Sequence, residues 1–131
     1  MPKAVLILSA LAACAAAGCS LPGAGPPLHQ RLQAEDPAER IDAIVEAART
    51  NQQQAVPLIV ERLGDSDSDV RFFAILGLEK LTGRTLGYEH WAPAERRQEA
   101  IEQWRQWLAA GRPREWPSSG SSSPPPAATA G

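Results

Sequence analysis

Few side chains in this sequence of 131 residues could carry out chemistry, and they lie far apart. The histidines are His29 and His90, and the cysteines are Cys14 and Cys19. Zinc sites group His, Cys or carboxylate ligands at short spacings, and neither histidine has such neighbours. The chain also lacks a glycine-rich phosphate loop and a nucleophile motif. The sequence therefore predicts no catalytic residue, no cofactor and no metal site, although a pocket joining His90 to acidic residues would favour an enzyme.

Three aspartates alternate with other residues at Asp65, Asp67 and Asp69, a spacing that is also found in calcium-binding loops. The glycine and the distal glutamate that complete an EF-hand loop are missing from the positions that follow. Aspartates that precede an apolar stretch can accept hydrogen bonds from the free N–H groups of a helix start. We therefore expect these residues to cap a helix rather than to bind calcium.

Aromatic residues in the C-terminal half are the only candidates for binding a partner. Rings of this kind anchor protein interfaces and stack on sugars, but they also fill hydrophobic cores. Core and cap packing is therefore one interpretation, and an exposed partner surface is the other. The candidate residues are Tyr88, Trp91, Trp104, Trp107 and Trp116. Trp116 lies beside the polar tail and should be the most exposed of them.

The elements that position these residues are predicted to be helices. Apolar side chains recur at spacings of three and four in four segments: 37–49, 53–63, 68–82 and 93–110. No segment alternates with a period of two over a length that suggests a strand. In residues 68–82 apolar side chains surround most of the helix, which predicts a central element packed on two faces. Gly77 in this helix should let a neighbouring helix approach closely.

An internal repeat connects the first and third of these segments. Four residues recur at an offset of 31: Asp36, Arg40, Ala43 and Ile44 return as Asp67, Arg71, Ala74 and Ile75. The letters Pro-Ala-Glu-Arg of residues 37–40 also return at 93–96, before the fourth segment. Asp at the N-cap suits a helix start because its carboxylate accepts hydrogen bonds from the unpaired N–H groups there. Pro suits the first helical position because it has no N–H group to leave unpaired.

The repeat resembles a known pattern. Leu63-Gly64-Asp65, followed by Asp69-Val70-Arg71 and Ala74, is similar to the HEAT-repeat family over residues 36–82. This resemblance implies a short all-α solenoid of about four helices that binds proteins, in which Asp and Arg residues pair with neighbouring repeats. The chain departs from the pattern after residue 82, where no second helix of a repeat is predicted. The aromatic segment that follows is expected to cap the exposed end of the stack.

The N-terminal residues have the pattern of an export signal. Lys3 precedes an apolar run of roughly ten residues, which is too short to span a membrane, and small residues follow. The ending Ala16-Ala17-Gly18-Cys19 resembles the bacterial lipoprotein signal, which implies a lipid on Cys19 as the new N-terminus. Cys14, which follows Leu11-Ala12-Ala13, is the alternative lipid site. An ordinary cleaved signal or a Cys14–Cys19 disulfide is the third interpretation.

These patterns divide the chain into four parts. They are a lipoprotein signal peptide in residues 1–18, a lipidated Cys with a Pro/Gly linker in 19–35, a HEAT-like domain with an aromatic cap in 36–112, and a disordered Ser/Pro/Ala tail in 113–131. The formal net charge of −2, without a clustered basic surface, argues against binding of nucleic acid.

The sequence therefore predicts a lipid-anchored protein without enzymatic activity that acts as an interaction or scaffold module at the bacterial cell envelope. Its partner is a protein of unknown identity, and no small-molecule substrate is indicated. Ser20, rather than Asp, follows Cys19 and favours the outer membrane if the host has one. Two alternatives are an envelope protein that binds glycan through exposed, coplanar Trp91 and Trp107, and an accessory subunit of an enzyme.

Overall fold

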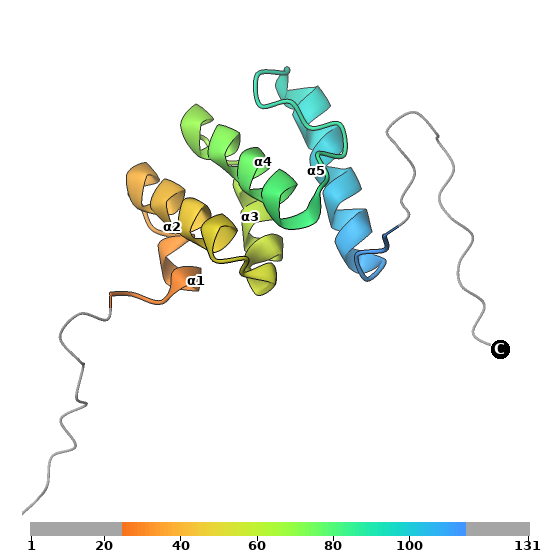
Figure 1. The fold of residues 1–131 in the computed structure, drawn as a ribbon. Coiled ribbons are helices and arrows are strands. Elements are labelled where there is room, and N and C mark those ends of the chain that lie inside the picture. The colour runs from red at the N-terminus through yellow and green to blue at the C-terminus, as the bar shows by residue number, and fades with distance from the viewer. Residues whose placement is uncertain (1–24, 115–131) are drawn as a thin grey trace, which may run out of the picture.

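The computed structural model describes residues 25–114, and this part of the chain is built from helices without a strand (Figure 1). The elements are α1 (Leu28–Arg31), α2 (Pro37–Arg49), the 3-10 helix η1 (Gln53–Ala55), α3 (Val56–Arg62), α4 (Ser68–Thr82) and α5 (Ala94–Ala109). The predicted all-α class is confirmed. The predicted signal peptide, Cys14, Cys19, Trp116 and most of the predicted tail lie outside the described residues. Within residues 25–114, no helix combines the length and the apolarity needed to cross a membrane.

The first residues of α2 and α4 show why these helices begin where the sequence predicted. A carboxylate oxygen of Asp36 accepts from the backbone N–H of Ala38 at 3.0 Å. A carboxylate oxygen of Asp67 accepts from the N–H groups of Asp69 and Val70 at 2.9 and 3.0 Å. Both aspartates are N-caps that satisfy otherwise unpaired donors of the first helical turn. The helix-capping prediction is confirmed for Asp67.

Arg40 and Arg71 make the internal repeat visible in the structure. One terminal nitrogen of Arg40 donates to the carbonyl oxygens six and five residues before it, at 2.6 and 2.8 Å. The matching nitrogen of Arg71 does the same at 2.9 and 3.0 Å. Each arginine therefore folds back from the first turn of its helix and holds the preceding loop in place.

The third helix start is related to the other two with a shift of one residue. Pro93 is the N-cap of α5 and makes no side-chain capping bond, so it corresponds to Asp36 rather than to Pro37. Arg97 then occupies the position of Arg40, and it donates to the carbonyl oxygen of Ala92 at 2.6 Å. The repeated letters at residues 93–96 align the sequences in a different register from the one that the structure shows.

Helix α4 lies at the centre of the fold, packed against α2 on one side and α3 on the other. Gly77 makes the close contact with α2 possible, because a Cβ atom at this position would lie 2.9 Å from Cγ2 of Ile44. The prediction of a close helix approach at Gly77 is confirmed. One buried core cluster extends from Leu32, beside α1, to Trp107 on α5.

Helix α5 packs against α3, which corrects the prediction that the second repeat lacks a second helix. Arg105 on α5 lies 3.4 Å from Glu61 on α3, and Ile101 on α5 lies near Gly64 at the end of α3. The stack therefore continues after a loop of residues 83–93. The length of this loop hid the pairing from the sequence pattern.

The folded region begins earlier than predicted, because residues 28–35 do not belong to the linker. Helix α1 packs against α2, and Leu32 is completely buried in the core. An ion pair between Arg31 and Glu46 adds a polar contact between the two helices. A single helical turn contains too few residues to reveal an apolar periodicity, which is why the sequence indicated a linker here.

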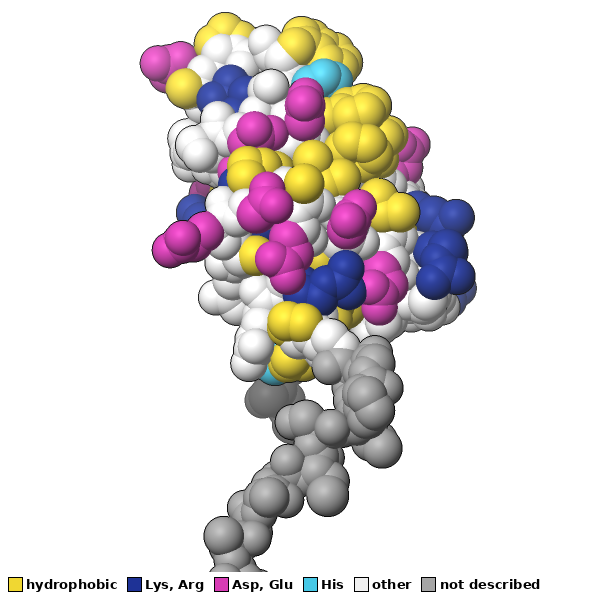
Figure 2. All heavy atoms as spheres, turned by 90° about the vertical axis from the view of Figure 1, so that its left-hand side faces the viewer, with side chains coloured by type: hydrophobic (Ala, Val, Ile, Leu, Met, Phe, Trp, Pro, Cys, Tyr) yellow, Lys and Arg dark blue, Asp and Glu magenta, His cyan; other side chains and the backbone are white. Residues whose placement is uncertain are grey.

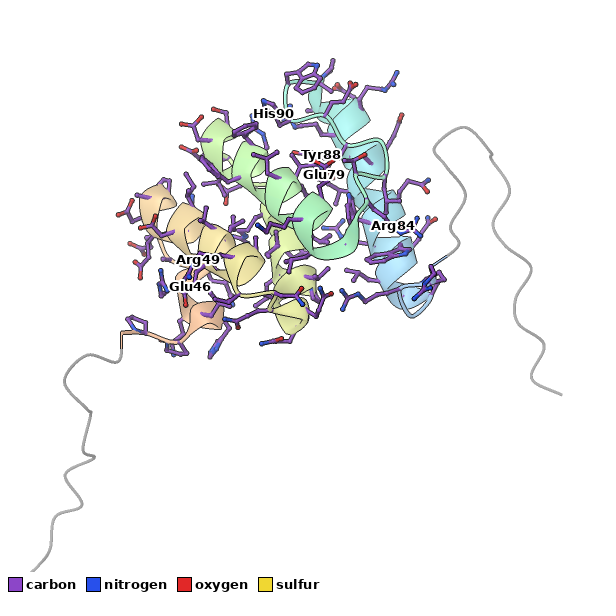
Figure 3. All side chains as sticks on the ribbon, viewed as in Figure 1. Glu46, Arg49, Glu79, Arg84, Tyr88 and His90 are labelled. Atoms are coloured by element: carbon purple, nitrogen blue, oxygen red, sulfur yellow. The ribbon has the colours of Figure 1, made fainter. Side chains whose placement is uncertain are left out.

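The two ends of the described chain leave the domain on the same side. In Figure 1 the start of α1 and the end of α5 both lie at the lower edge of the fold. His90, in the loop before α5, lies at the opposite edge (Figure 3).

Candidate functional site

Three of the predicted partner-binding residues are part of the core. Tyr88, Trp104 and Trp107 each expose 4 % or less of their surface. The polar atom of each ring donates to a backbone carbonyl: Tyr88 to Leu63 at 2.6 Å, Trp104 to Thr85 at 3.2 Å and Trp107 to Pro113 at 3.0 Å. The partner-surface interpretation is wrong for these three residues, because their rings already fill the space between the loop, α3 and α5. The core-and-cap interpretation holds for them.

Tyr88 occupies an unusual electrostatic environment within this cap. Burial raises the pKa of its phenol above the ordinary value of 10.0, while the positive charges of Arg71 and Arg97 act in the opposite direction. Both guanidinium groups therefore lie close enough to influence the same hydroxyl group. The phenol is neutral at physiological pH and acts as a hydrogen-bond donor.

Trp91 is the predicted candidate that the structure leaves on the surface, with 72 % of its side chain exposed. Because Trp107 is buried, the two rings do not form the exposed pair that the glycan-binding alternative required. Trp91 instead contacts His90, with ring centroids 4.8 Å apart. His90 in turn lies 4.8 Å from Phe72 on α4, and Phe72 lies 5.4 Å from Phe73. A continuous row of rings therefore runs from the loop onto α4.

Large apolar side chains on α2 and α4 extend this row. Val45, Phe72 and Leu76 are 44 %, 37 % and 43 % exposed, respectively. Phe72 and Leu76 are four residues apart, so they lie on one face of α4. We use the term apolar α2–α4 surface for the set Val45, Phe72, Phe73, Leu76 and Trp91. Figure 2 shows hydrophobic side chains interspersed with acidic ones on the face of the domain that includes α2.

The apolar α2–α4 surface corrects the prediction that the two packed faces of the central helix bury its apolar residues. Neighbouring helices cover only part of α4, and Phe72 and Leu76 lie on the part that they leave open. Val45, which belongs to the apolar stripe predicted for residues 37–49, is exposed in the same way. The sequence signal for this surface was that apolar residues surround most of the helix. That pattern fits a helix packed on two faces, but it fits equally well a helix with one apolar face left uncovered.

A groove of about 360 Å³ lies between α2 and α4 on this surface. Gly77 and Ile44 lie at its base, and Leu76 and Val45 are among its walls. The charged residues Arg49 and Lys80 also line it. The lining is mainly apolar, so the groove suits an apolar side chain of a partner better than a polar ligand.

A second hollow, which we call the Arg71–Arg97 pocket, has a volume of about 410 Å³. It is lined by Ser68, Asp69, Arg71, Phe72, His90, Trp91 and Arg97. His90 therefore shares a pocket with an aspartate, the condition under which the sequence would favour an enzyme. Among the described residues, however, His90 forms no hydrogen bond with Ser68 or Asp69.

Asp65 links the two repeats. Its carboxylate accepts from a terminal nitrogen of Arg40 at 3.0 Å, while Nε of Arg40 lies 3.0 Å from the other oxygen as an ion-pair contact. Asp65 also accepts from the N–H of Asp67 and lies 3.5 Å from Arg62. These contacts use the carboxylate for folding, in agreement with the implied Asp–Arg pairing. Within the described part, no three His, Cys, Asp or Glu side chains converge closely enough for a metal ion.

A third hollow lies at the end of α5, beside Trp107. The guanidinium groups of Arg84 and Arg112 lie 5.9 and 5.5 Å from the centre of the Trp107 ring. Arg112 also donates to the side-chain oxygen of Gln53 at 2.6 Å. These contacts hold the last described residues against η1, between α2 and α3, so we interpret this hollow as structural.

The stacked helix pairs, the Arg–Asp link between them and the exposed apolar face define a small repeat protein of the α-solenoid class. Residues 25–90, half of the chain, match the family described as HEAT repeats, and the chain belongs to this family. The match extends the predicted region of 36–82 in both directions and includes α1. A comparison with curated proteins and one with solved structures each gave no match.

Proposed function

We propose that this protein is a non-catalytic interaction or scaffold module that is lipid-anchored at the bacterial cell envelope. HEAT repeats suggest a protein-interaction scaffold, because stacked helix pairs present extended surfaces to partners. The observation that supports a binding role here is the apolar α2–α4 surface. Val45, Phe73 and Leu76 line one groove, Phe72 and Trp91 line the Arg71–Arg97 pocket, and Phe72 and Leu76 share a face of α4. Exposed apolar side chains clustered in this way mark interaction sites.

The surface can be tested by photo-crosslinking in cells. A photoreactive amino acid in place of Leu76 should yield one dominant crosslinked protein, because this exposed side chain lines the groove between α2 and α4. The matched control is Glu102, an exposed residue of α5. Identical products from positions 76 and 102, or no product from position 76, would show that the apolar surface has no specific partner.

The lipid anchor is supported by the sequence of residues 1–19 and needs its own experiment. Intact mass should be measured for the membrane-extracted protein and for the variants Cys19→Ala and Cys14→Ala. We expect a chain that begins at Cys19 and carries added acyl mass, and this species should disappear only in Cys19→Ala. If the acylated species disappears only in Cys14→Ala, the lipid is attached to Cys14 instead. A soluble, unacylated product would leave the interaction module without its membrane attachment.

A further inference from the structure

The equivalent arginines of the two repeats, Arg40 and Arg71, differ in whether a carboxylate of the chain lies beside them. The guanidinium group of Arg40 is buried and is neutralised by the carboxylate of Asp65, which belongs to the loop before the next repeat. A terminal nitrogen of Arg40 donates to the carboxylate at 3.0 Å, and Nε lies 3.0 Å from its other oxygen as an ion-pair contact, so both oxygens face the guanidinium group. In the first repeat, the charge is therefore balanced within the fold.

Arg71 has the same position and the same carbonyl contacts, but it has no such carboxylate. Among residues 25–114, no carboxylate oxygen lies within 4.0 Å of Arg71 or Arg97. Nε of Arg71 is buried and makes no hydrogen bond, and the same is true of Nε of Arg40, so the two arginines differ in the neighbouring carboxylate and not at this atom. In the register that the structure shows, Pro93 corresponds to Asp67, so the counterpart of Asp65 is Trp91 and the chain has no carboxylate at this position.

The two arginines line one pocket, and its other walls are the rings of Phe72, His90 and Trp91. Asp69 is the only acidic residue in this lining, so the two guanidinium groups exceed the negative charge beside them. Both arginines are half-buried, and partial removal from solvent strengthens the attraction of their charges to an added anion. Phe72 belongs both to this pocket and to the apolar α2–α4 surface.

We propose that the Arg71–Arg97 pocket binds an aspartate or glutamate side chain of a partner protein, while a neighbouring apolar residue of the same segment packs on Phe72, Leu76 and Trp91. The inference rests on the proposed function, since it specifies the chemistry of the partner at the same surface. The partner's carboxylate supplies for Arg71 the contact that Asp65 makes with Arg40. Arginine suits this role because its planar group binds both oxygens of a carboxylate.

The first test is a selection from a displayed library of random peptides against the folded domain. We expect the selected peptides to combine Asp or Glu with a nearby aromatic or aliphatic residue. A labelled peptide from this set and its Asp→Asn copy then serve as probes, and the copy should bind about tenfold more weakly. Equal affinity of the two probes, or a selection that yields no acidic peptides, would overturn the proposal.

A pair of protein variants locates the contact. Arg97→Gln should lower the affinity for the Asp peptide about tenfold and leave the affinity for the Asn peptide unchanged. Together the two peptides and the two proteins form a double-mutant cycle, which isolates the contact between Arg97 and the carboxylate. Arg96→Gln removes the same charge from the adjacent exposed residue and should change neither affinity by more than about twofold. Equal effects of the two variants would show that only general charge attraction is involved and would overturn the proposal.

Two further measurements separate this inference from the proposed function. Leu76→Gln should weaken both peptides, because both use the apolar surface. If it does so while Arg97→Gln has no selective effect, the interaction surface is correct and the carboxylate site is wrong. If Leu76→Gln affects neither peptide, the proposed surface itself is wrong. Sedimentation that shows a dimer of the chain alone, dissociated by Arg97→Gln, would assign the site to a second copy and overturn the choice of partner.

Discussion

At Tyr88, one hydroxyl group joins the cap of the fold to the end of α3. Because Tyr88 is the only tyrosine in the chain, its titration can be followed directly by the ultraviolet absorbance of tyrosinate. Burial raises its pKa, so the folded domain should titrate above 10.0, and the midpoint should return to about 10 in concentrated urea. The folded state favours the neutral phenol. This contribution to stability is therefore complete below pH 10.0 and is lost as pH rises through the folded-state pKa.

The variant Tyr88→Phe provides the control for this titration. It should remove the tyrosinate signal and lower the free energy of unfolding by about 1 kcal/mol, because the carbonyl of Leu63 loses its donor. A midpoint at or below 10.0 in the folded protein would show that solvent reaches the phenol and that the cap is open.

The aromatic candidates could be identified from the sequence by residue type, but residue type does not show which of them are buried in the core and which are exposed. Trp104 and Trp107 are buried because α3 lies against the face of α5 that carries them, and that contact joins segments far apart in the chain. Trp91 has the same side chain but is exposed, because nothing in the described chain covers it. The prediction that residues 68–82 are packed on two faces missed the exposure of Phe72 and Leu76 for the corresponding reason. Helical spacing shows which residues share a face and not what covers that face.

At the scale of the elements, Gly77 sets the distance between α2 and α4. Gly77→Ala should destabilise the domain by about 1 kcal/mol, because overpacking of Ile44 outweighs the gain of about 1 kcal/mol in helix propensity. The clash involves Cγ2, which is attached directly to Cβ of Ile44, so no flexible end of the side chain can move away. Urea unfolding of the two proteins measures the difference.

Gly64→Ala is the matched control for this substitution. A Cβ atom there would be 3.7 Å from its nearest neighbours, an ordinary contact, so stability should change by no more than about 0.5 kcal/mol. If Gly77→Ala is as stable as the unmodified protein, the helices can separate at this point and the close packing is not required.

The extents of α2 and α4 were predictable because local chemistry determines their ends. Asp36 and Asp67 cap the starts, and Gly83 follows α4 in a left-handed conformation with φ of 72°. Helix α5 was also predicted, but its place in the stack was not, since residues 83–93 separate it from α4 and its partner is α3. The position of a helix such as α5 in the stack depends on its tertiary contacts and not on the local sequence signals that mark its ends.

At the scale of the whole molecule, residues 25–114 share one core, which makes a prediction about cooperativity possible. Leu32 lies at one end of the core, and all four tryptophans lie in residues 91–116 at the other end of the chain. Leu32→Ala should cost about 3 kcal/mol because it leaves a cavity in a buried site. Tryptophan fluorescence and circular dichroism should report the same lowered midpoint, as expected for a single cooperative unit.

Gln33→Ala, at an exposed position beside Leu32, should change the midpoint only slightly. If Leu32→Ala lowers the midpoint by circular dichroism and leaves the fluorescence transition in place, α1 and α5 unfold independently. The repeat would then be the unit of stability, rather than the domain.

The positions of the two ends of the described chain distinguish one edge of the domain from the opposite edge. Both ends of the described chain leave from one edge, and His90 lies at the opposite edge. The two points at which the described chain ends, residues 25 and 114, therefore lie away from His90. A support or a fused domain joined directly at either point would leave the loop that carries His90 uncovered.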